Sequence, residues 1–129
     1  MNINELMIGN YVLYKGRYIC KVYGITENLV SIEDLGGNTG EVYPRELYPI
    51  ELSEDVLDVC GFRFNGVFAF VKDDIWCTNE TGIWEFILCD KEEDTFKHLE
   101  VSIIIESLHE LQNIYRVFYK KDLDVNFNK

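Results

Sequence analysis

Few residues of this chain belong to the types that carry out acid–base, nucleophilic or metal chemistry, and none has the spacing of a catalytic motif. The two histidines, His98 and His109, have no second His or Cys at metal-ligand spacing. A zinc site would therefore have to be assembled from residues distant in the sequence. No serine lies in a G-x-S-x-G nucleophile elbow. We predict no catalytic residues, no metal and no cofactor, with an unrecognised hydrolase or nuclease-like activity as the alternative.

The four cysteines are Cys20, Cys60, Cys77 and Cys89, and none forms a C-x-x-C pair. Each lies within or beside an apolar stretch, which predicts buried free thiols. Residues 1–5 lack the basic start and apolar run of a secretory signal, so a disulfide framework is not expected. No apolar run approaches the roughly 20 residues that span a bilayer. We expect a cytoplasmic protein that does not contact membranes.

Two further segments resemble ligand-binding loops only in composition. The acidic run Asp90–Asp94 lacks the alternating oxygen ligands, glycine and final Glu of a calcium loop, and is interpreted as a solvated turn. Gly36, Gly37 and Gly40 lack the Lys-Ser/Thr ending and the following helix of a phosphate loop. Neither segment predicts a bound ion or nucleotide.

The net charge of −11 bears on the class of partner. Residues 1–51 contain 4 basic and 7 acidic residues, and the remainder contains 8 basic and 16 acidic residues, so neither half is a basic module. Direct binding to nucleic acid, which depends on Lys and Arg neutralising phosphates, is disfavoured. A basic protein partner is favoured. The acidity also allows an alternative function, an inhibitor whose carboxylates mimic DNA.

The first half alternates polar and apolar residues as half-buried strands do. Five strands are expected: one that opens at residues 8–12, then residues 17–26, 29–33, 41–44 and 48–50, with one helical turn at Pro44–Leu47. This order suggests a small Src-homology-3-like or Tudor-like barrel over residues 1–52.

The second half, residues 53–129, is predicted as an antiparallel meander packed against a C-terminal helix. Ser53 is placed to cap a short helix, and Asn65-Gly66 is the strongest hairpin signal in the chain. Ser107 and Glu110 form an S-x-x-E capping box before an apolar stripe that runs to Tyr119. A final strand is expected at Leu123–Phe127. The predicted class is α+β and β-rich, with both halves sharing one core.

Aromatic residues and the last helix supply the candidate partner-binding surface. Tyrosines crowd the first half, where small barrels use such side chains to line a peptide groove; the alternative is that they fill the core while their hydroxyls reach water. Trp76 and Trp84 are expected in the core of the meander. On the helix, several polar side chains lie off the apolar stripe; the alternative is that Gln112 and Asn113 cap neighbouring strands or loops. The candidate partner-binding residues are Tyr11, Tyr14, Tyr43, Tyr48, His109, Gln112, Asn113 and Arg116.

Three patches resemble a family of short uncharacterised proteins of Bacteroides-type genomes, often encoded beside prophage or mobile-element genes. The patches are Glu5–Val12, Tyr48–Phe62 and Ser107–Tyr115. The resemblance covers most of the chain in order and implies a genomic context without an activity. We therefore expect a non-enzymatic protein-interaction or regulatory module, of mobile-element origin, that acts on an unknown partner.

Overall fold

The computed structural model describes residues 1–89 and 99–127, so the acidic run Asp90–Asp94 and His98 lie outside the described residues. The chain divides into two compact units. The first unit comprises residues 1–51, 107–123 and 127–129, and the second unit comprises residues 52–106 and 124–126. Each unit contains one five-stranded antiparallel sheet. The β-rich α+β class predicted from the sequence is confirmed.

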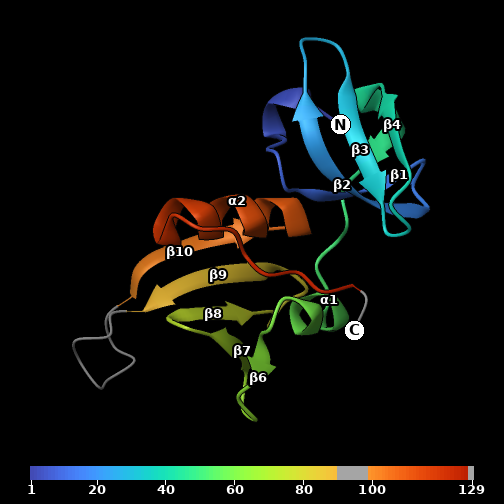
Figure 1. The fold of residues 1–129 in the computed structure, drawn as a ribbon. Coiled ribbons are helices and arrows are strands. Elements are labelled where there is room, and N and C mark those ends of the chain that lie inside the picture. Colours follow the sequence, from blue (N-terminus) through green and yellow to red (C-terminus); the bar gives the residue numbers. More distant parts are fainter. Residues whose placement is uncertain (90–98, 128–129) are drawn as a thin grey trace. The chain divides into compact units, whose positions relative to one another are not determined.

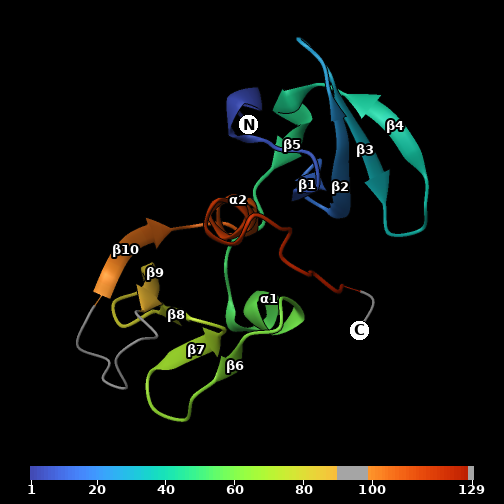
Figure 2. The same cartoon turned by 60° about the vertical axis from the view of Figure 1, so that its left-hand side comes forward.

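The sheet of the first unit has the strand order β4-β3-β2-β1-β5. Figure 2 shows β5 beside β1 and β4 at the opposite edge. Two single turns of 3-10 helix, η1 and η2, precede β1 and β5. The bounds of these elements are η1 Ile3–Glu5, β1 Tyr11–Tyr14, β2 Tyr18–Ile25, β3 Val30–Asp34, β4 Thr39–Val42, η2 Pro44–Glu46 and β5 Leu47–Tyr48.

The strands of the first unit place alternate side chains in a common hydrophobic cluster. Val12, Cys20 and Val22 are buried on neighbouring strands, with Val12 directly opposite Cys20. Val42 of β4 and Leu47 of β5 belong to the same cluster although these strands form the two edges. The sheet is therefore curved around a single core. No pairing between β4 and β5 closes it into a barrel in the part of the chain that the structure describes.

The second unit holds a meander in which consecutive strands are neighbours, in the order β10-β9-β8-β7-β6 (Figure 1). Its core includes Phe62, Cys77 and Phe86, all buried. The helix α1 begins after Ser53, whose hydroxyl accepts the Val56 N–H as predicted. The bounds are α1 Glu54–Val59, β6 Arg63–Phe64, β7 Ala69–Lys72, β8 Ile75–Thr78, β9 Trp84–Cys89 and β10 Leu99–Ile105.

The β6–β7 hairpin has a longer loop than the Asn65-Gly66 signal indicates. The strands pair Phe64 with Phe70, and the Asn65 N–H donates to the Ala69 carbonyl, so residues 65–68 all lie in the loop. A two-residue turn would have started β7 at Val67. The Asn65 side chain explains the difference, because it accepts backbone N–H groups that strand pairing would otherwise use.

The last helix, α2 (Leu108–Tyr119), has the bounds and the Ser107 N-cap that the sequence predicts. Its place in the fold differs from the expected division at residue 52, since residues 107–123 group with the first unit. Just before the helix, Ser107 forms an isolated bridge with Glu51, and the Leu108 N–H donates to the Ile50 carbonyl. The expected strand at residues 123–127 is wrong, because no strand pairing is assigned to that segment.

Cys20, Cys60 and Cys77 are free and buried, which confirms the prediction for these three thiols. Burial raises the pKa of Cys60 and of Cys77 to about 12. No described helix is both long and apolar enough to cross a bilayer.

Candidate functional site: an aromatic groove on the second unit

A hollow with a mainly apolar lining lies over β6, β7 and β8 and has a volume of about 920 Å³. Val71 of β7 faces Trp76 of β8 and Arg63 of β6 in register, so the three side chains form a row across the sheet. The loop between β6 and β7 supplies the wall. We call this hollow the aromatic groove; it is lined by Arg63, Phe64, Asn65, Val67, Phe68, Val71, Asp73 and Trp76.

Apolar side chains are unusually exposed along this groove. Val67 is 77% exposed, Phe64 54% and Phe68 45%. Single exposed apolar residues are common in soluble proteins, whereas a contiguous apolar patch is typical of an interaction surface. The groove combines such a patch with a concave shape, so it can take a large apolar group from a ligand.

The loop that carries Val67 and Phe68 is held by one side chain. The Oδ1 atom of Asn65 accepts the backbone N–H groups of Val67, Phe68 and Ala69 at 2.9, 3.1 and 3.2 Å. The Phe68 ring packs edge-on against Trp76, with 5.3 Å between the ring centroids. These contacts fix the wall before any ligand arrives, which reduces the entropy lost on binding.

The two tryptophans occupy opposite faces of the meander. Trp84 is buried and shares its face with Phe86 two residues later, as predicted. Trp76 lies one residue out of phase with the buried Cys77 and lines the groove instead. The expectation that both tryptophans lie in the core of the meander is therefore wrong for Trp76. Successive side chains of a strand point to opposite faces, so the inward position of Cys77 places its neighbour Trp76 on the other face. This alternation is present in the sequence of β8.

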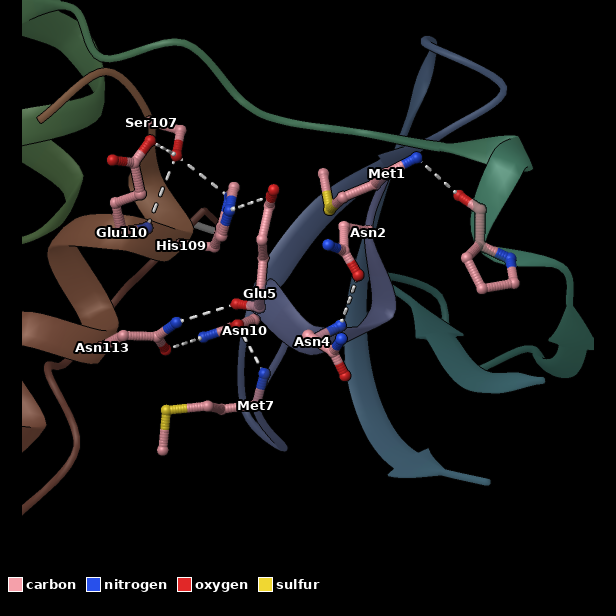
Figure 3. Close-up of polar contacts among 11 residues, drawn as sticks. Met1, Asn2, Asn4, Glu5, Met7, Asn10, Ser107, His109, Glu110 and Asn113 are labelled. Carbon is pink, nitrogen blue, oxygen red and sulfur yellow. Dashed lines mark hydrogen bonds and ion pairs between the residues drawn. The ribbon is translucent and has the colours of Figure 1, made fainter. Parts of the chain in front are cut away.

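In the first unit, α2 is joined to the N-terminal segment by polar side chains (Figure 3). Asn113 accepts from the Asn10 Nδ2 at 2.8 Å and donates to the Glu5 carbonyl at 3.0 Å. Gln112 accepts the Tyr11 N–H and donates to the Gly9 carbonyl, both at 2.9 Å. The expected alternative, in which these two amides cap neighbouring strands or loops, is the arrangement that the structure contains.

A hydroxyl, an imidazole and two carboxylates meet at the start of α2 (Figure 3). The Ser107 Oγ lies 3.0 Å from the His109 Nδ1 and 2.8 Å from the Glu110 Oε1, and the His109 Nε2 lies 3.7 Å from the Glu5 Oε2. One bond differs from a standard capping box: the Glu110 carboxylate accepts the Ser107 hydroxyl and not the Ser107 backbone N–H. Burial is the main influence on His109 and lowers its pKa, against the two carboxylates that raise it.

Serine, histidine and carboxylate are the composition of a nucleophilic triad, and no local pattern reveals their proximity because Glu5 is 104 residues from His109. Here the Ser107 side chain already serves as the helix N-cap, and Ser107 is only 2% exposed. A buried hydroxyl that accepts a backbone N–H cannot reach a substrate in this conformation. The cluster is built to fasten the helix.

The expected tyrosines do not form one groove. Tyr14 packs against the core of the first unit, whereas Tyr48 lies on the opposite face, since Leu47 is the residue paired with Tyr14. Tyr43 and Tyr48 are each 50% exposed, and the Arg45 guanidinium lies over the Tyr43 ring. Tyr11 packs edge-on against Phe127.

The four helix residues also have different surroundings. His109 and Gln112 are buried and Asn113 is half-buried. Arg116 is exposed and lies 3.4 Å from the Asp122 carboxylate. Only Arg116 of this group offers a charged side chain to solvent.

Among residues 1–89 and 99–127, no group of three or more His, Cys, Asp or Glu side chains is placed to hold a metal ion. No family model, curated protein or solved structure matches the chain. The chemistry of the described residues is therefore the basis for a functional proposal.

Proposed function

We propose that the protein is a non-enzymatic, cytoplasmic protein-interaction module whose main contact surface is the aromatic groove. The observation that carries this proposal is the pre-formed wall of the groove, in which Asn65 holds Val67 and Phe68 outward beside Trp76. Aromatic side chains in a preorganised apolar pocket are the typical energetic centre of protein interfaces. An origin in a mobile element rests on the sequence resemblance alone.

The residues expected to contact a partner divide into two groups in this proposal. Tyr43, Tyr48 and Arg116 keep accessible surface and remain candidate contact residues. Gln112 and Asn113 are assigned to holding α2 in the first unit, because their amides bond to backbone groups there.

For the first unit we propose an open form of the Src-homology-3-like barrel. Supporting it are the order of the five strands, the 3-10 turn before β5, and the shared core cluster that includes both edge strands. Methyl contacts between Val30 of β3 and Leu47 of β5 in NMR spectra are expected if the sheet curls as a barrel does. A flat sheet without them would contradict this proposal.

Affinity capture from the native host tests the functional proposal. Phe68→Ala and Val67→Ser each remove apolar surface from the groove, and Val67 is exposed enough that its change leaves folding intact. Ile83→Ala is the matched control, since Ile83 is 50% exposed in the same unit and does not line the groove. We expect both groove variants to lose a protein that the native chain and the control retain. Retention by all variants would overturn the proposal.

The distribution of charge favours one second candidate, the acidic inhibitor that mimics DNA. The second unit contains 14 acidic and 4 basic residues, whereas the first unit contains 9 and 8. A DNA mimic would bind a DNA-binding protein through carboxylates and compete with DNA for it. Competition with DNA, together with unchanged capture by the groove variants, would support mimicry over the groove proposal.

A further inference from the structure

Almost all of the net negative charge of this chain lies in the second unit, which carries the groove. The residue counts give the second unit a formal charge of −10 and leave the first unit at −1. A charge of this size on about half of the chain produces a local potential that attracts cations and repels anions. A ligand of the groove approaches through this field.

The described basic side chains of the second unit, Arg63 and Lys72, already have partners within it. The Arg63 Nη1 lies 2.8 Å from the Asp58 Oδ1 and donates to the Phe62 carbonyl at 3.0 Å. The Lys72 Nζ donates to the Cys60 carbonyl at 3.0 Å. With 14 acidic and 4 basic residues, the second unit keeps a large excess of negative charge.

Carboxylates flank the aromatic wall on both sides. Asp73 lines the groove itself. A second hollow, of about 360 Å³, shares Phe64 and Phe68 with the groove and is lined by Glu54 and Glu80. The two hollows are thus adjacent across the same pair of rings, and each has an acidic residue in its lining. An extended ligand can occupy both.

We propose that the occupant is an extended basic segment of another protein, with one large apolar side chain seated in the aromatic groove against the paired rings of Phe68 and Trp76. Lysine or arginine side chains on either side of this anchor reach Asp73 in one direction and Glu54 and Glu80 in the other. This inference rests on the proposed function and adds the chemistry of the partner. A second copy of the chain is disfavoured, because two units of charge −10 repel each other.

The contributions of the two kinds of contact differ. The apolar anchor removes aromatic surface from water and supplies most of the affinity. The charged contacts are solvent-exposed and act mainly on the association rate and on the choice between partners, and salt weakens them. The binding of a basic segment should therefore depend on both the anchor and the ionic strength.

Fluorescence anisotropy of labelled synthetic peptides tests the inference on the full chain. The first probe is a short peptide of lysine, glycine and serine with one central leucine. The second replaces the leucine with serine, and the third replaces every lysine with glutamate. We expect the first probe to bind best, with roughly tenfold or greater loss in either substituted peptide and a marked loss at high salt.

Two sets of variants locate the binding. Phe68→Ala removes the wall, and Glu54→Gln with Glu80→Gln and Asp73→Asn neutralises the flanking charges; the control Glu27→Gln with Glu41→Gln neutralises exposed carboxylates of the first unit. We expect the first two changes to weaken the first probe and the control to leave it unchanged. Val67→Ser repeats the test of the wall at a more exposed residue.

Failure of the inference is distinguishable from failure of the proposed function. Two results would overturn only the inference that the partner segment is basic. One is equal binding of the lysine and glutamate peptides. The other is that no peptide binds to a chain that still captures a host protein through the groove. Capture from the host that is insensitive to Phe68→Ala and Val67→Ser would overturn both.

Discussion

The side-chain amide of Asn10 donates to the side-chain carbonyl of Asn113 across 2.8 Å, although 103 residues separate them. The remaining groups of both amides bond to backbone atoms, with Asn10 accepting the Met7 N–H and Asn113 donating to the Glu5 carbonyl. Together with Gln112, this pair connects α2 to the segment that leads into β1. The chain thus leaves the first unit at residue 51 and returns to it at residue 107 through specific polar contacts.

We predict that Gln112→Met lowers the free energy of unfolding by about 1–3 kcal/mol, because it leaves the Tyr11 N–H and the Gly9 carbonyl without their partners. Methionine preserves most of the side-chain volume, so the loss reports on hydrogen bonding and not on a cavity. Urea denaturation measures it. Arg116→Ala, which removes only an exposed ion pair, should change stability by less than about 0.5 kcal/mol. A Gln112→Met variant as stable as the native chain would contradict the role assigned to this amide.

We predict that His109 makes the chain less stable as the pH falls below about 6.5, the usual pKa of an unfolded histidine. Burial lowers its pKa in the folded state, so the unfolded state binds the proton first and acid favours unfolding. The effect is absent at higher pH and grows until the pH reaches the lowered value. The facing groups are Ser107, Glu5 and Glu110. Comparing denaturation of the native chain and of His109→Gln between pH 8 and pH 5 isolates this contribution. Parallel stability curves would refute it.

The buried thiols should resist alkylation in the folded chain. Burial raises the pKa of Cys60 and Cys77 to about 12, so almost no thiolate is present at neutral pH, and neither sulfur is accessible to a reagent. In a Cys89→Ser variant, we expect the three remaining cysteines to react with a thiol reagent only slowly in buffer and at once in denaturant. Mass spectrometry identifies the labelled sites. Rapid labelling of Cys60 or Cys77 in buffer would show that the second unit opens readily.

Asn65→Ala should loosen the wall of the aromatic groove. It removes the acceptor of three backbone N–H groups, at Val67, Phe68 and Ala69. We expect faster hydrogen exchange at these amides, a loss of about 1–2 kcal/mol in stability, and weaker binding of any groove ligand. Asn28→Ala, at an exposed position between β2 and β3, is the matched control. Unchanged hydrogen exchange at the amides of residues 67–69 would contradict the role assigned to the Asn65 side chain.

Local chemistry was sufficient to predict most elements of this fold. Serines 53 and 107 each cap a helix, because an N-cap hydroxyl acts on a backbone N–H only three residues away. Period-2 alternation located β1, β2 and β3 within a few residues. The loop of Asn65 was mispredicted because the Asn-Gly pair indicates a two-residue turn, whereas the asparagine side chain competes for the backbone.

The amino-acid sequence by itself determined the β-rich class, the caps, the burial of three cysteines and the total charge, since each follows from composition or from residues close in the chain. Tertiary structure alone decided which unit receives α2, because Gln112 and Asn113 find partners more than 100 residues away. It also decided the candidate site. The exposure of Phe64, Val67 and Phe68 beside Trp76 depends on which face of the meander is covered, and the placement of most of the net negative charge in the same unit depends on how the chain divides. Neither property is encoded in a local pattern, because apolar residues on either face of a strand look alike until the packing of the sheet distinguishes them.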